Sequence, residues 1–194
     1  MKVPDKITAF LIFMLAFVCA HADDLEIGQL MHMLAKNPSG QATFVEKKYI
    51  GIIDKPIVSS GELSFSAPDK LEKHTLTPKP ESLVLNGRIL TIDRPGKSRM
   101  TVSLDEHPEV AAFIESIRGT LAGDLSSLEA NYALMLSGSE KNWQLSLSPK
   151  GEEFSQIFKN ILISGTGPDV LTIEIDQRDG DHSEMIISKS VSKR

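Results

Sequence analysis

Residues 57–77 read IVSSGELSFSAPDKLEKHTLT, and this stretch decides the fold class. Apolar and polar side chains alternate in its first half, where Leu63 and Phe65 fall on one face of an extended chain. This period of two predicts strands over 57–66 and 70–77. A short Ala-Pro-Asp turn separates them. We expect antiparallel neighbours, because parallel strands need a long crossover connection.

The same period of two recurs along most of the chain. Turn residues separate the runs, and the Asn-Gly pair at 86–87 is the strongest of these hairpin signals. The further expected strands span residues 41–50, 81–85, 88–93, 98–104, 133–137, 142–148, 159–165, 170–177 and 182–189. Short turns join most of these strands, so the sequence predicts a large antiparallel sheet.

Helical spacing interrupts the strands in a few short segments. Residues 24–36 predict a helix that Asp23 or Asp24 caps, and a helix from Pro108 ends at Gly123. Asp124 caps a shorter helix, and one more helical turn is expected over 152–158. The second helix carries an apolar stripe, which fits either a core-packing helix or a lid over a binding site: Val110, Phe113, Ile114, Ile117 and Leu121.

The apolar faces of the strands need a cover. A sheet of this size curls, and only three or four short helices are available to cover it. Either the helices complete an ordinary core, or the curled sheet leaves a cavity that an apolar ligand fills. The candidate cavity wall consists of Leu63, Phe65, Leu83, Leu85, Leu145, Leu147, Ile173 and Ile175.

The first 22 residues resemble an export signal. Two lysines precede an apolar run over 7–18, which as a helix would span about 18 Å and so is too short for a ~30 Å hydrocarbon core. The small residues Ala20 and Ala22 fit a cleavage site. We expect a signal peptide over 1–22, cleaved after Ala22, and one domain over 23–194. A lipid-modified Cys19 or an uncleaved anchor are the alternatives.

Composition narrows the function classes. Hydrophobic residues make up 41% and charged residues 24% of the 194, which are globular values and exclude a wholly disordered chain. A net charge of -5 argues against a nucleic-acid surface, so we expect no nucleic-acid partner. The single cysteine excludes an internal disulfide. Aromatic residues are only 6%, so the apolar faces are mainly aliphatic and have few rings to fill a curled interior.

No catalytic constellation is recognisable in the sequence. There is no Gly-x-Ser-x-Gly elbow, and the acidic run at 176–181 is too short for a calcium loop. The histidines that follow the signal peptide fall on different expected elements: His32, His74, His107 and His182. We therefore expect neither enzyme activity nor a metal or cofactor.

Several of these segments, taken in order, resemble LolA-type periplasmic lipoprotein carriers. The resemblance covers most of the chain after the signal peptide. The segments are ATFVEK at 42–47, SGELSF at 60–65, APDKL at 67–71, PES at 80–82 before the Asn-Gly turn, WQLSLSPK at 143–150 and the acidic hairpin DGD at 179–181. FVEKKY at 44–49, together with PKPE at 78–81, is similar to a LolA-related branch of that family.

The resemblance implies a mainly β fold of the α+β type, in which a single curved antiparallel sheet forms an unclosed half-barrel lidded by short helices. It also implies a monomeric periplasmic carrier that holds acyl chains in a hydrophobic interior, between an inner-membrane donor and an outer-membrane acceptor. The carriers have an arginine that holds the lid where this chain has Ala67. They also have aromatic residues where it has Glu72, Lys73 and His74.

These departures leave the cargo open between a lipoprotein and another lipid-linked product. The alternatives to a carrier are a periplasmic protein-binding module and an accessory factor of a lipid-synthesis system.

Overall fold

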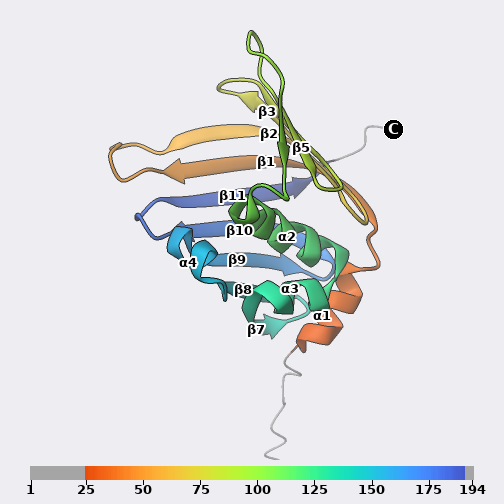
Figure 1. Cartoon of the computed structure of the whole chain (residues 1–194). Helices are drawn as coiled ribbons and strands as arrows, with labels where there is room; N and C mark the ends of the chain where they lie inside the picture. The colour runs from red at the N-terminus through yellow and green to blue at the C-terminus, as the bar shows by residue number, and fades with distance from the viewer. Residues whose placement is uncertain (1–24, 191–194) are drawn as a thin grey trace, which may run out of the picture.

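Eleven strands form one antiparallel sheet in the computed structural model, which describes residues 25–190 (Figure 1). The signal peptide expected over 1–22 lies outside the described residues. The strands are β1 (Ser39–Tyr49), β2 (Ile57–Ser66), β3 (Lys70–Thr77), β4 (Glu81–Asn86), β5 (Ile89–Asp93), β6 (Met100–Ser103), β7 (Tyr132–Ser139), β8 (Asn142–Pro149), β9 (Phe158–Thr166), β10 (Asp169–Gln177) and β11 (His182–Lys189). The predicted strands are all present, with their ends shifted by at most two residues.

The order of the strands explains the shape of the sheet. It runs β6-β5-β4-β3-β2-β1-β11-β10-β9-β8-β7, so two meanders are joined where the first strand pairs with the last. The edge strands β6 and β7 do not pair with each other. Figure 1 shows the half formed by β1–β6 curving away from the half formed by β7–β11. The unclosed half-barrel expected from the sequence is therefore confirmed.

Four helices lie on one side of this sheet: α1 (Ile27–Leu34), α2 (Pro108–Ala122), α3 (Leu125–Asn131) and α4 (Glu152–Ile157). As predicted, α2 ends at Gly123, which has a φ of 67°, and the carboxylate of Asp124 accepts a hydrogen bond from the Ser127 N–H at 3.0 Å. The expected cap of the first helix is wrong. Glu26 is the cap, and its N–H donates to the side chain of Gln29 at 3.0 Å.

The helices cover mainly the β7–β11 half of the sheet (Figure 1). The main core packs helix side chains such as Leu30 and Leu128 onto this half. Trp143 is fully buried there, and its indole N–H donates to the Gly167 carbonyl at 2.9 Å. Tyr132 is also buried, and its hydroxyl donates to the Ala112 carbonyl of α2 at 2.8 Å. Both polar tips thus keep a partner inside the core.

The predicted hairpin at Asn86 exists, but its turn is one residue further along. Asn86 pairs with Ile89, so Gly87 and Arg88 form the two-residue loop. Gly87 has a φ of 60°, which glycine adopts without steric cost. The Asn-Gly signal located the hairpin correctly and misplaced its register, because Asn86 extends the strand instead of entering the turn.

At Gly61 the backbone of β3 leaves no room for a side chain on β2. A Cβ atom at this position would lie 1.9 Å from the His74 carbonyl oxygen, and the pairing register shifts between Ser60 and Gly61. Since the obstacle is backbone, no side-chain rotation relieves the overlap. Gly40 on β1 is a matched contrast, because nothing lies within 4 Å of a Cβ added there.

We predict that Gly61→Ala destabilises the protein by about 1–3 kcal/mol, the usual cost of overpacking, and lowers the Tm by several degrees. Gly40→Ala, in the same sheet, leaves the Tm unchanged or raises it slightly. Thermal unfolding followed by circular dichroism checks both variants. Equal Tm values for the two would contradict the close approach of β2 and β3.

Candidate functional site

The face of the sheet that the helices cover continues beyond them onto β1–β6, and we call it the inner face. The pairing register carries this face across the junction of the two halves. Ile187 on β11 is the partner of Phe44 on β1, which in turn is the partner of Gly61 on β2. The main core contains no residue of β1–β6 within the described part of the chain. This half of the inner face therefore carries side chains outside the helix-packed core.

Two rows of side chains cross β2–β6 on this face. Residues in a row are partners from strand to strand, and the first row consists of Phe65, Leu71, Leu85, Leu90 and Val102. The second row consists of Leu63, Lys73, Leu83, Ile92 and Met100. We call the nine apolar members of the two rows the apolar wall. Phe65 and Leu85 are buried, Met100 is 47% exposed and the others are half-buried.

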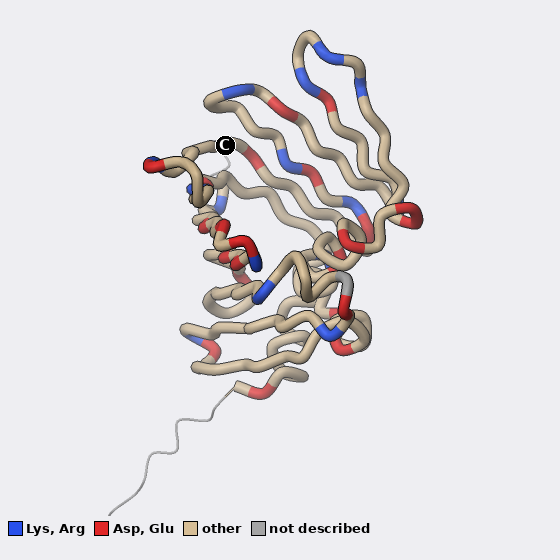
Figure 2. The backbone as a smooth tube through the Cα atoms, turned by 60° about the vertical axis from the view of Figure 1, so that its left-hand side comes forward, with Lys and Arg blue, Asp and Glu red and all other residues tan. Residues whose placement is uncertain are grey.

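The inner face becomes polar beyond the second row. The next partners across β3 and β4 are Thr75 and Glu81, and Glu81 forms an ion pair with Arg94. Figure 2 shows residues of both charge signs close together on β1–β6, without one large patch of a single sign. The apolar wall thus ends at a polar boundary, partway along each strand.

An ion pair lies at this boundary. Lys73 Nζ is 2.5 Å from Glu46 Oε2, and the same carboxylate oxygen accepts a hydrogen bond from Ser59 Oγ at 3.4 Å. The ammonium also lies 4.9 Å from the centre of the Phe44 ring, a cation–π distance. The side chains of Lys73 and Glu46 are 26% and 18% exposed, so the ion pair is partly buried.

All eight residues predicted to line a cavity lie on the inner face, in two separate groups. Leu145, Leu147 and Ile173 are buried in the main core, and Ile175 packs against it. The other four, Leu63, Phe65, Leu83 and Leu85, belong to the apolar wall. The sequence did not identify Leu71, Leu90, Ile92, Val102 and Met100 as wall residues. Their partners on neighbouring strands were the missing information, and no local pattern supplies it.

The predicted lid stripe on α2 is divided in a similar way. Phe113 and Ile117 pack against the main core, and the Phe113 ring stacks on Phe158 at 5.5 Å between centroids. The remaining stripe residues are half-buried and outside that core: Val110, Ile114 and Leu121. Phe113 and Ile117 therefore contribute to the packing of the main core.

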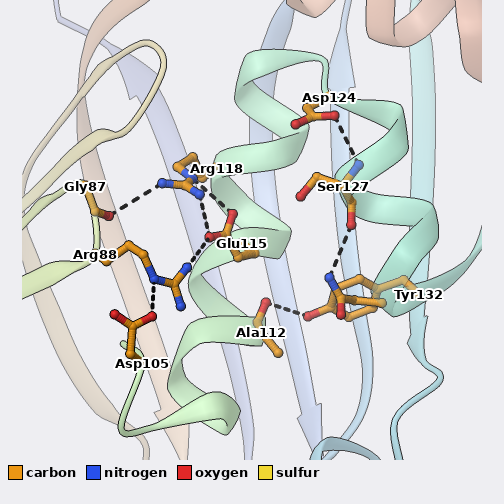
Figure 3. Close-up of polar contacts among 10 residues, drawn as sticks. Gly87, Arg88, Asp105, Ala112, Glu115, Arg118, Asp124, Ser127 and Tyr132 are labelled. Carbon is orange, nitrogen blue, oxygen red and sulfur yellow. Dashed lines mark hydrogen bonds and ion pairs between the residues drawn. The ribbon is translucent and has the colours of Figure 1, made fainter. Parts of the chain in front are cut away.

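Charged side chains connect α2 to the β4–β5 hairpin (Figure 3). Arg118 Nη1 donates to the Gly87 carbonyl at 3.5 Å, and its Nε donates to Glu115 at 3.0 Å. Arg88, in the hairpin turn, lies 3.9 Å from the same Glu115 carboxylate and also pairs with Asp105. This network links helix and sheet, as the arginine of the carriers is expected to do, but its central arginine is on the helix.

The described residues, 25–190, contain no cluster of three or more His, Cys, Asp or Glu that could hold a metal ion. His74 and His182 each pair with a carboxylate, Glu72 at 2.9 Å and Asp176 at 2.8 Å.

Two ionisable groups among residues 25–190 have a shifted pKa. Hydrogen bonds from Lys70 and His74 lower the pKa of Glu72, and burial raises the pKa of Tyr132. No helix in this part of the chain is long and apolar enough to cross a membrane.

Comparison with known proteins points to one family. The family model described as "Outer membrane lipoprotein carrier protein LolA-like" matches residues 19–193. The chain is 25% identical over 191 residues to an outer-membrane lipoprotein carrier protein of Dechloromonas aromatica, covering 97% of this chain and 87% of that protein. It is 26% identical over 147 residues to one of Azotobacter vinelandii, covering 75% of this chain and 67% of that protein.

Among solved structures, a LolA superfamily protein from Nitrosomonas europaea matches with a TM-score of 0.46 and 11% identity. The match covers 88% of this chain and 96% of that one.

The network between α2 and the hairpin yields a prediction about local stability. We expect Arg118→Met to increase hydrogen exchange of the α2 amides about fivefold, since it removes roughly 1 kcal/mol of hydrogen bonding to the hairpin. Arg94→Met removes an ion pair in the β5–β6 turn and should leave α2 unchanged. Hydrogen–deuterium exchange with mass spectrometry measures both. Unchanged α2 exchange in Arg118→Met would show that the network does not hold the helix.

Proposed function

Because the chain belongs to the family of LolA-like outer membrane lipoprotein carrier proteins, we propose that it is a periplasmic carrier of acyl chains. Its cargo is a lipoprotein or another lipidated product, which it moves from an inner-membrane donor toward an outer-membrane acceptor. The protein acts as a monomer and changes no covalent bond of its cargo. It therefore needs no catalytic group, metal or cofactor.

The observation that carries this proposal is the apolar wall. Its nine side chains lie on the inner face of the sheet, outside the main core of the described residues. Each methylene moved from water to apolar surroundings contributes about 0.8 kcal/mol, so a chain of roughly sixteen carbons needs on the order of 12 kcal/mol of compensating burial. The half-buried wall offers apolar surface of this kind, and α2 lies beside it through the Arg118 network.

The test compares two neighbouring residues of β4 that face opposite sides of the sheet. Leu83 belongs to the apolar wall, whereas Val84 points to the outer face and is also half-buried. We expect Leu83→Asn to weaken binding of a fluorescent fatty-acid probe about tenfold, because it replaces the apolar methyl groups of a half-buried leucine with a polar amide. Val84→Asn should change the affinity less than twofold.

Titration of the probe measures both affinities, and circular dichroism verifies that each variant is folded. Variants at Phe113 or Ile117 are less informative, since both residues pack into the main core. Equal losses in the two β4 variants, or full binding by Leu83→Asn, would refute the assignment of the wall.

A second experiment tests the carrier function itself. Mass spectrometry of the protein purified from the periplasm should detect bound lipid. Its reproducible absence would favour a protein-binding module instead.

A further inference from the structure

The polar boundary of the inner face indicates which charge the head group of the cargo carries. This inference rests on the proposed function. Lys73 is the one charged member of the two rows as the structure describes them, and its neighbours in the row are Leu63 and Leu83. A purely apolar ligand gains nothing from a charge in this position. A lysine in such a place suits an amphiphile, whose chain ends in a polar group.

The side chain of Lys73 reaches from the apolar wall toward the polar part of the face. Its backbone lies between those of Leu63 and Leu83, yet its ammonium meets Glu46, which is the pairing partner of Ser59 and lies beyond the second row. The four methylenes of the lysine thus extend the apolar surface, while the charge sits at the boundary. An ammonium has three donor hydrogens, and among residues 25–190 Glu46 is the one acceptor of a hydrogen bond from Lys73.

The other charges at the boundary favour a negative ligand group over a positive one. The Glu46 carboxylate already accepts from both Lys73 and Ser59, and it is less exposed than the lysine. Glu81 is neutralised by Arg94. A cationic ligand would have to displace Lys73 from Glu46, whereas an anionic one can share the ammonium or replace Glu46 as its partner.

We propose that the cargo is an acyl lipid whose head group carries a negative charge, and that Lys73 binds this group. The acyl chain rests on the apolar wall, and the acidic group lies at the polar boundary beside Phe44. Glu46 holds the ammonium when no cargo is bound, because the ion pair and its hydrogen bond stabilise a partly buried charge. Lys73 is therefore a specificity-determining residue, and Glu46 competes with the ligand for it.

The experiment compares a fluorescent fatty acid with its neutral methyl ester and with the amine of the same chain. The wild-type protein should bind the acid about tenfold more tightly than the ester, the size of one charge-assisted hydrogen bond, and the amine least tightly. Lys73→Met should remove the difference between acid and ester. Glu46→Gln should increase the preference for the acid severalfold, because the competing carboxylate is gone.

Two control variants separate this site from other effects. Lys47→Met removes the same charge from the outer face of β1 and should leave the preference for the acid intact. Lys73→Arg keeps the charge and should retain the preference. If Lys73→Met does not fold, the predicted increase in Glu46→Gln still tests the site, and an unchanged preference in that variant would overturn the assignment. Thermal unfolding reports the stability of each variant.

The outcomes separate this inference from the function on which it rests. If acid and ester bind equally well to the wild type, or the amine binds best, the assignment to Lys73 is wrong and the carrier proposal stands. If Lys47→Met and Lys73→Met lose acid binding equally, the loss comes from the net charge of the protein. The assignment of acid binding to Lys73 is then overturned. If none of the three probes binds, the proposed function itself fails.

Discussion

Four short helices have to cover the apolar face of an eleven-stranded sheet, and this mismatch determines most of the structure. Because the helices are short, at about 1.5 Å of rise per residue, together they cover mainly the β7–β11 half. There they build an ordinary core around Trp143, Tyr132 and the leucines of β8. On the β2–β6 half the same face stays partly open. The apolar wall is therefore a consequence of the strand count, since the helices within residues 25–190 are too few to close over it.

The pairing of β1 with β11 allows both halves to share one face. β1 also pairs with β2, so it belongs to the helix-covered half and to the open half at once. Its inward residues show this double role. Phe44 is 2% exposed and has Ile187 as its partner, whereas Glu46, one step further on the same face, forms the ion pair with Lys73 of the open half. β1 therefore links the two halves, with Phe44 beside Ile187 of the covered half and Glu46 paired with Lys73 of the open half.

The sequence predicted the strands well because a half-covered antiparallel sheet imposes a period of two that local composition reveals. It predicted the two ends of α2 for a similar reason, since Pro108 and Gly123 have strong positional preferences. It could not separate core from wall. Leu145 and Leu83 have the same local pattern, and only the helices above Leu145 distinguish them. The Glu46–Lys73 pair was equally hidden, because it joins residues 27 positions apart across an intervening strand.

The dimensions of the apolar wall favour a flexible ligand that lies across the strands. Five strands at about 4.8 Å spacing make it roughly 24 Å wide, whereas its two rows lie only about 7 Å apart along each strand. A surface of this shape is a strip, and an acyl chain matches a strip better than a compact ring system does. The low aromatic content of the chain, 6%, agrees with this, since eight of the nine wall residues are aliphatic or methionine and only Phe65 has a ring. The strip is bordered by the Arg118 network near Gly87 and by Lys73 and Glu46 on its polar side. A bound chain would thus have an apolar bed, a helix beside it and a charge at its margin, so that burial holds the chain while the boundary orients its head group.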